Sequence, residues 1–288
     1  MTFKFSEYLS DLTKKVSRSP QAKEAGVYKL RLWEILKPAA GGSSKVGGER
    51  WDNISTRGHI QLKDTALRAK LICKTLESWV SNQEAPGTLP QEKKQGECQL
   101  NQLGWINGKR NEITCPYQDN YEVWTTRGKG EELYLSQQAD RTLLVCMDMV
   151  SIILTAFQNV VRKQDGWALD RGQDVCQYMY ERLEEWSNDS IAKELMELWF
   201  QATETETIRN NFPVNLSPKR DEQWQYLFRS VGSLVHGMQC SKDTKKANSY
   251  YVSCLAWKDG NGCDVGQDDE GREAEQVSNG RATTERIL

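Results

Sequence analysis

Cysteine is the residue type in this chain with the greatest potential for chemistry. The sequence has eight cysteines in 288 residues, spread about one per predicted element: Cys73, Cys98, Cys115, Cys146, Cys176, Cys240, Cys254 and Cys263. Thiolates that bind zinc usually occur in pairs two to four residues apart, because both must reach one tetrahedral ion. The closest pair, Cys254 and Cys263, is too widely spaced for that, so we predict no metal site. An even number of separated cysteines instead favours disulfides, whose connectivity the sequence leaves open.

The redox state of these cysteines depends on the compartment of the protein. The opening residues, MTFKFSEYLSDLTKKVSRSP, contain no apolar run of the length found in a secretory signal, because Lys4, Glu7 and Asp11 interrupt it. Two hypotheses follow. Either the thiols stay reduced in a cytosol, or the chain reaches an oxidising place by an unusual route. We expect at least two disulfide bridges in the mature protein.

Other residues with catalytic potential form no recognisable pattern. Only His59 and His236 supply imidazole groups, and no nucleophile signature surrounds any cysteine. The glycine-rich stretch 41–48 lacks the spacing and the preceding strand of a phosphate-binding loop. Acidic pairs within 183–186 and 203–206 have the character of solvated helix faces. We therefore predict a protein that is not an enzyme and that has no catalytic residues and no cofactor.

The elements that must position the cysteines are helices. Apolar residues recur at three- and four-residue steps, which predicts helices over about 2–17, 21–37, 62–80, 131–163, 170–187, 190–209 and 219–238. The middle of the longest helix, Leu143–Phe157, is apolar on nearly all sides and is expected to be buried. It contains Asp148 and is shorter than the roughly twenty residues of a membrane span, so we predict no span within this chain. Strand signals are confined to short pieces such as Ser249–Cys254.

These patterns predict an all-α fold, a multi-helix bundle with a long central helix and irregular glycine- and proline-rich connections. We divide the chain into an N-terminal helical hairpin (1–38), a glycine-rich linker (39–58), a cysteine-bearing helical domain (59–258) and a disordered acidic tail (259–288).

Composition narrows the class of partner. The chain contains ten tryptophans and ten tyrosines, and its mean hydropathy of -0.70 fits a helical globule with a charged surface. We interpret the helical tryptophans, including Trp33, Trp186 and Trp199, as core residues. Basic residues predominate in 1–80 but are scattered among Leu, Trp and Ala rather than clustered. We therefore expect no nucleic acid partner.

Some features of the chain resemble a known family. Cysteine-bearing helices, tryptophan after a short acidic turn (Leu76–Trp79 and Leu183–Trp186) and the glycine-rich linker without a signal peptide resemble large antigen families of malaria parasites (Plasmodium). The chain is most similar in character to the schizont-infected cell agglutination antigens, which are variant surface antigens, and next to the interspersed-repeat family.

This resemblance implies an exported protein, displayed on or under the surface of the infected red cell, with oxidised cysteines. It also implies a role in interaction or immune evasion and a protein partner from the host cell or the immune system. One alternative is a cytosolic helical scaffold or adaptor with reduced cysteines. Another is an enzyme whose site one sequence does not reveal.

Overall fold

The computed structural model describes residues 5–15, 30–36, 45–47, 49–52, 65–81, 133–158, 160–163, 166–169, 173–201, 235–257 and 263–264, together with Trp124 and Phe228. Its helices are α1 (Phe5–Lys14), α2 (Leu32–Leu36), α3 (Glu49–Asp52), α4 (Thr65–Ser81), α5 (Gln138–Gln158), α6 (Val175–Trp186) and α7 (Asp189–Leu195), which continues into the π-helical turn η2 (Met196–Phe200). Its strands are β1 (Lys45–Val46), β2 (Leu133–Tyr134), β3 (Val160–Lys163), β4 (Gly166–Leu169), β5 (Val235–Lys242), β6 (Tyr250–Trp257) and β7 (Cys263–Asp264).

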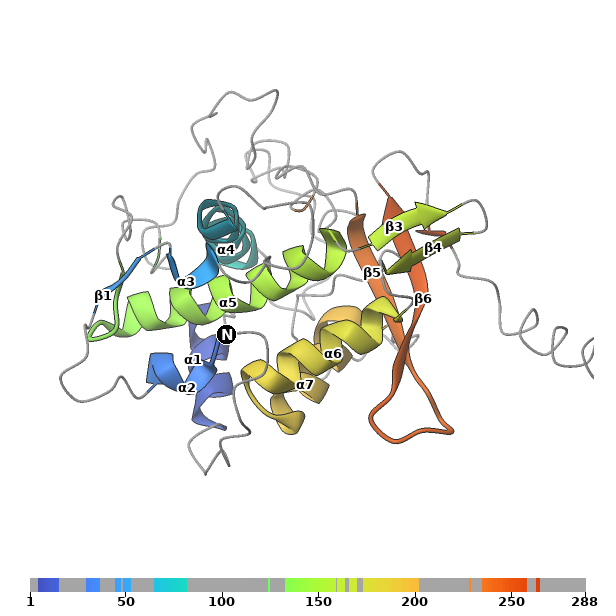
Figure 1. Ribbon diagram of the computed structural model, residues 1–288. Helices are drawn as coiled ribbons and strands as arrows, with labels where there is room; N and C mark the ends of the chain where they lie inside the picture. The colour runs from blue at the N-terminus through green and yellow to red at the C-terminus, as the bar shows by residue number, and fades with distance from the viewer. Residues whose placement is uncertain are drawn as a thin grey trace, which may run out of the picture.

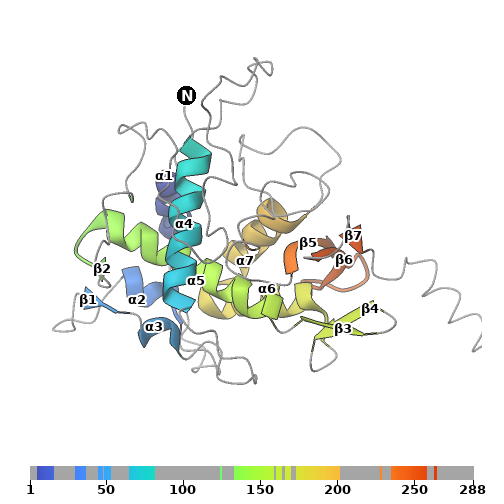
Figure 2. The same cartoon turned by 90° about the horizontal axis from the view of Figure 1, so that it is seen from above.

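Helix α5 is the centre of the molecule, as its apolar sequence predicts. Every residue from Thr142 to Phe157 is buried. Figure 1 shows α5 running through the middle of the structure, and Figure 2 shows α4 crossing over it. Helices α1, α2, α4 and α6 all contact α5. A helix that is hydrophobic on all sides requires such neighbours, because no face of it can be left in water.

The central helix is shorter than the sequence predicted. The expected helix 131–163 is replaced at its start by β2, which pairs with β1, and at its end by β3, which pairs with β4. At the first boundary the carboxylate of Asp140 accepts a hydrogen bond of 2.9 Å from the backbone N–H of Tyr134. This bond turns the chain back before the helix begins. At the second boundary the β-branched pair Val160–Val161 favours a strand over a further helical turn.

Helices predominate, but the all-α prediction is incomplete because the structure also contains small antiparallel sheets. Strands β5, β6 and β7 form a three-stranded sheet in that order. Strand β5 begins at Val235, inside the expected helix 219–238. The strand signal at 249–254 extends to Trp257 in β6 and gains a full partner in β5. The spacing of apolar residues within one segment does not show that this segment pairs with another one. The pairing of β5 with β6 was therefore missed by the sequence pattern.

The β5–β6 hairpin is closed by a hydrogen-bonded turn. The backbone N–H of Asp243 donates to the carbonyl of Ser249 at 2.9 Å. Asn248 has a φ of 58°, in the left-handed region that asparagine tolerates better than most residues. The residues between these positions form a tip beyond the last strand pair.

Helix α6 is attached to β6 by side chains that bond to the strand backbone. Asp174 caps the start of α6 through the N–H groups of Cys176 and Gln177, and its second carboxylate oxygen accepts from the N–H of Val252 at 3.0 Å. The amide oxygen of Gln177 accepts from the N–H of Tyr250, also at 3.0 Å. Two consecutive outward N–H groups of β6 are therefore bonded to a helix instead of to another strand.

The predicted linker 39–58 contains ordered elements. Strand β1 and helix α3 lie within it, and Trp51 of α3 is only 2% exposed.

The expected helix 21–37 is described only from Leu30 and is helical in α2; its earlier residues lie outside the described part. Of the expected acidic tail, only the short strand β7 is described. None of the helices among the described residues has both the length and the apolar character required to cross a membrane.

The tryptophans divide between the core and the surface. Trp186 is 2% exposed and Trp199 is 1% exposed, as predicted, whereas Trp33 on α2 is 43% exposed.

Candidate functional site: a buried carboxylate cluster and its disulfide frame

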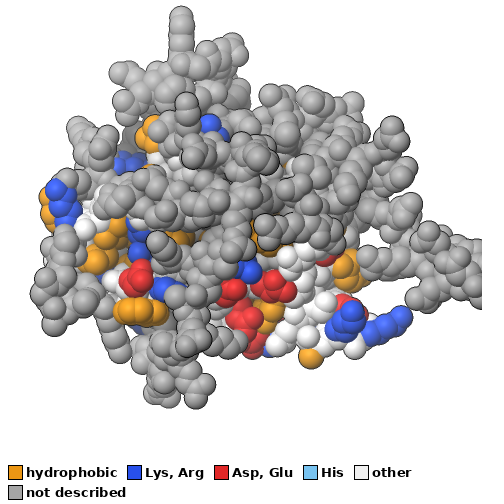
Figure 3. All heavy atoms as spheres, in the orientation of Figure 1, with side chains coloured by type: hydrophobic (Ala, Val, Ile, Leu, Met, Phe, Trp, Pro, Cys, Tyr) orange, Lys and Arg blue, Asp and Glu red, His pale blue; other side chains and the backbone are white. Residues whose placement is uncertain are grey.

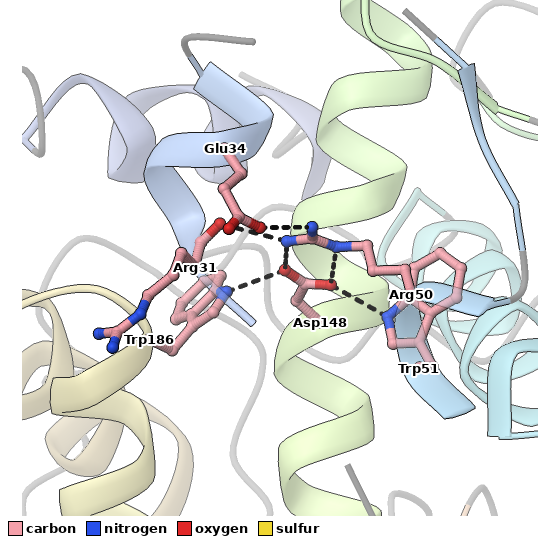
Figure 4. Close-up of polar contacts among 6 residues, drawn as sticks. All are labelled: Arg31, Glu34, Arg50, Trp51, Asp148 and Trp186. Atoms are coloured by element: carbon pink, nitrogen blue, oxygen red, sulfur yellow. Dashed lines mark hydrogen bonds and ion pairs between the residues drawn. The ribbon is translucent and has the colours of Figure 1, made fainter. Parts of the chain in front are cut away.

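Asp148 lies at the middle of α5 and is fully buried. One carboxylate oxygen accepts from Arg50 Nε and from Trp51 Nε1, each at 3.0 Å. The other accepts from Arg50 Nη2 at 2.7 Å and from Trp186 Nε1 at 3.0 Å. Figure 4 shows the guanidinium and the two indoles converging on this carboxylate from α3 and α6. One acidic residue thus joins three helices.

The geometry determines what this carboxylate can do chemically. A carboxylate has about four lone-pair sites, and Asp148 uses each of its two oxygens for two hydrogen bonds. A general base must have an acceptor site within reach of the substrate proton. Asp148 offers none in this arrangement, and its side chain is closed off from solvent. The cluster is therefore a structural anchor.

Arg50 extends the cluster to α2. Its Nη1 bonds to Glu34 Oε2 at 3.0 Å, and its Nη2 also donates to the carbonyl of Arg31 at 3.2 Å. Burial by itself lowers the pKa of the Arg50 guanidinium, but the charges and hydrogen bonds of Asp148 and Glu34 outweigh it and raise that pKa above its usual range. The guanidinium therefore stays charged. Arg31 in turn donates to the carbonyl of Glu185 on α6 at 2.8 Å.

Sequence reasoning missed this cluster. It treated Asp148 only as an argument against a membrane span and placed Arg50 and Trp51 in a linker. A usable signal was present, because a charge inside an all-round apolar helix is costly unless donors meet it. The sequence does not say which of the many Arg and Trp residues supply those donors. Contacts across about a hundred residues depend on the tertiary fold.

Two disulfides join different elements of the core. Cys73–Cys146 links α4 to α5, and Cys176–Cys240 links α6 to β5. All four cysteines are at most 1% exposed. The protein is thus stabilised by disulfides, as the sequence predicted, and two of the pairings that it left open are assigned.

The other predicted cysteines are only partly described. Cys254 on β6 is disulfide-bonded as well. Cys263 lies in β7, and nothing of its side chain is described. Cys98 and Cys115 lie outside the described residues.

The remaining candidates for chemistry do not come together. His236 lies in β5 without a described side chain, and His59 lies outside the described residues, as does the acidic stretch 203–206. Glu185 of the other acidic pair binds Arg182 at 2.7 Å. Among the residues that the structure describes, no group of three metal-ligating side chains is present. Within the glycine-rich stretch 41–48, Lys45 and Val46 form β1.

A tyrosine pair connects α6 to the sheet and to α7. The rings of Tyr180 and Tyr250 lie 5.0 Å apart, and the Tyr180 hydroxyl donates to Asp189, which also pairs with Lys193. Burial raises the pKa of Tyr250 to about 12. Burial and the hydrogen bond to Asp189 raise the pKa of Tyr180 as well. Bonds from Lys193 and Tyr180 lower the pKa of Asp189.

Comparison with known proteins adds no family: no protein-family model, curated protein or solved structure matches this chain.

Proposed function

We propose that this chain is a non-enzymatic interaction protein that is exported to, or displayed at, the surface of an infected host cell, of the antigen type that its sequence resembles. The observation that carries the proposal is the pair of buried disulfides, each of which joins two different core elements. Bridges of this kind persist in oxidising environments and are rare in a cytosol. They suit a protein that must keep its shape outside the cell that made it.

The Asp148 cluster supports the same proposal. Its ion pair and hydrogen bonds fix α3 and α6 on the central helix without leaving an acceptor for a substrate. A rigid frame with a charged surface is what a binding protein or antigen requires. Its partner is then a protein of the host cell or of the immune system.

The redox part of this proposal is tested by counting thiols on natively expressed protein. The protein is denatured without reductant, alkylated, then reduced and alkylated with a heavier reagent before peptide mass spectrometry. We expect Cys73, Cys146, Cys176 and Cys240 to carry only the heavy label. The light label on all eight cysteines would contradict the surface role and would favour a cytosolic scaffold.

The location is tested separately. A tagged copy is expressed in a parasite of the class that the sequence resembles, and infected red cells are stained before and after selective permeabilisation of the host membrane. We expect signal at the host cell in one of these two conditions. Signal that appears only after the parasite itself is permeabilised would contradict export while leaving the thiol result intact.

A further inference from the structure

The tip of the β5–β6 hairpin is the most exposed continuous segment of the described chain. Thr244, Lys245, Lys246, Ala247 and Asn248 are all exposed. Figure 1 shows the hairpin extending away from the helices, and Figure 3 shows basic side chains gathered at the same place on the surface. Exposed tips of small and polar residues are the preferred sites of proteolytic cleavage.

The two lysines of the tip are available to a protein that recognises basic side chains. No described carboxylate forms an ion pair with the ammonium group of Lys245 or Lys246. The nearest acidic residue in sequence, Asp243, uses Oδ1 to accept from the backbone N–H of Lys245 at 2.8 Å. The hairpin tip therefore exposes two adjacent positively charged side chains to solvent.

We propose that Lys245–Lys246 is a cleavage site for an endoprotease of the trypsin-like class, whose specificity pocket binds a basic side chain before the scissile bond. In this reaction the protease adds water across the peptide bond that follows Lys246. The C–N bond breaks, Lys246 keeps a new carboxylate, and Ala247 becomes a new amino terminus. No oxidant or cofactor is required.

Little structure opposes this cleavage. A protease binds its substrate in an extended form, so the tip must open locally. Opening breaks the bond between Asp243 N and Ser249 O and the turn bond to Lys245 N. The strand pairs from Lys242–Tyr250 onward can remain in place.

The cleaved protein is expected to stay folded as two associated chains. The segment before the cut is fixed by the Cys176–Cys240 disulfide. The segment after it is held by pairing along β5 and by the bonds of Tyr250 and Val252 to α6. The result is therefore a nicked form of the same fold.

The chain contains a matched control for this site. Lys14 and Lys15 form a second dibasic pair, and their side chains are 73% and 49% exposed. Lys14 is helical in α1 and pairs with Asp11, whereas Lys15 pairs with Glu194 on α7. The two pairs share sequence and exposure but differ in backbone structure and in ion pairing. Sequence alone does not distinguish them.

The test is limited digestion of the oxidised full chain with trypsin, followed by mass spectrometry and size-exclusion chromatography. We expect cleavage after Lys246 at least ten times faster than within Lys14–Lys15, with both products eluting together at the volume of the intact protein. The variant Lys245→Gln/Lys246→Gln should lose this cleavage. The variant Lys14→Gln/Lys15→Gln should retain it at the wild-type rate.

Two results would overturn the proposal. One is earlier cleavage at Lys14–Lys15 while the tip remains intact. The other comes from protein isolated from its natural source, where we expect peptides that begin at Ala247. If every recovered peptide instead spans the bond between residues 246 and 247, the tip is not a processing site in the cell.

Discussion

Asp148 and Arg50 depend on each other, because a buried charge is tolerated only while its partner is present. The pair is bidentate, and the remaining acceptor sites of the carboxylate are taken by Trp51 and Trp186. Such a pair is weak evidence for a large net stabilisation, since desolvation offsets much of the attraction. Loss of one partner is a different matter, because it leaves the other charge buried and unpaired.

We predict that Asp148→Asn destabilises the fold by about 3–5 kcal/mol, the cost of breaking a buried ion pair. The amide keeps the shape of the carboxylate but turns an NH2 group toward at least one donor. Chemical denaturation measures the change. The control is Asp11→Asn, which removes an exposed pair with Lys14 and should cost at most about 1 kcal/mol. Equal stability of the two variants would show that the cluster is not an anchor.

The tyrosines at the α6–sheet contact predict a loss of stability at alkaline pH. The folded pKa of Tyr250 is raised to about 12 by burial, so the unfolded chain, with a tyrosine pKa of about 10, releases its proton first. The unfolded state then binds fewer protons than the folded state between these values, and the free energy of unfolding falls as pH rises. Denaturation midpoints measured from about pH 9 to about pH 12 test this.

The control for the alkaline effect is Tyr250→Phe, which should flatten part of the slope. Tyr8 and Tyr180 have pKa values that burial also raises, so some slope should persist in this variant. A midpoint that does not change across the range would contradict the assignment of these hydroxyls as buried.

At the scale of elements, the sequence predicted the helices whose buried face produces a regular spacing of apolar residues along the local sequence. The apolar run 143–157 identified α5, and the three-four spacing of 62–80 identified α4 (Thr65–Ser81). The spacing over 170–187 identified α6, which begins later than predicted, at Val175, after its N-cap Asp174. The apolar period is a local signal, so periodicity suffices to find these helices, although not their exact ends.

The elements that the sequence missed are those defined by distant partners. Helix α3 has four residues, too few for a period, and is held by the contact of Arg50 with Asp148. Strands β3 and β5 were read as helix because their strand character comes from pairing with β4 and β6. The all-α prediction was therefore right that helices predominate among the described residues, but it missed the small antiparallel sheets.

Asp174 allows the contact between α6 and β6 to be tested without loss of the helix cap. In Asp174→Asn the carbonyl oxygen can still accept from the N–H groups of Cys176 and Gln177, and asparagine is as good an N-cap as aspartate. The new NH2 group then faces the N–H of Val252. We predict a loss of about 1.5–3 kcal/mol, the value for a hydrogen bond to a charged group.

Hydrogen exchange locates this effect. The amide of Val252 should exchange faster in Asp174→Asn, while that of Gln177 should not change. Asp243→Asn makes the same change of charge in the hairpin tip and keeps the acceptor for Lys245 N; it should stay within about 0.5 kcal/mol of the wild type. Unchanged protection of Val252 would show that Asp174 does not hold the strand.

For the molecule as a whole, the two assigned disulfides are expected to contribute almost equally. They close loops of 73 and 64 residues, and the chain-entropy relation gives about 4 kcal/mol for each. We predict losses of that order for Cys73→Ala/Cys146→Ala and for Cys176→Ala/Cys240→Ala. Urea denaturation of both variants measures them. A loss below about 1 kcal/mol for either pair would mean that its bridge does not restrain the unfolded chain.

The bonds from α6 to Tyr250 and Val252 also bear on how separate molecules meet. A strand with open N–H groups and residues such as Tyr and Val is a template for strand addition by another chain, which leads to aggregation. Side chains of a helix occupy those groups here, and the Cys176–Cys240 bridge fixes that helix beside the sheet. Oxidation of this one cysteine pair therefore also favours solubility. In a reduced chain whose α6 moves away, the exposed N–H groups of β6 would be open to strand pairing with another molecule.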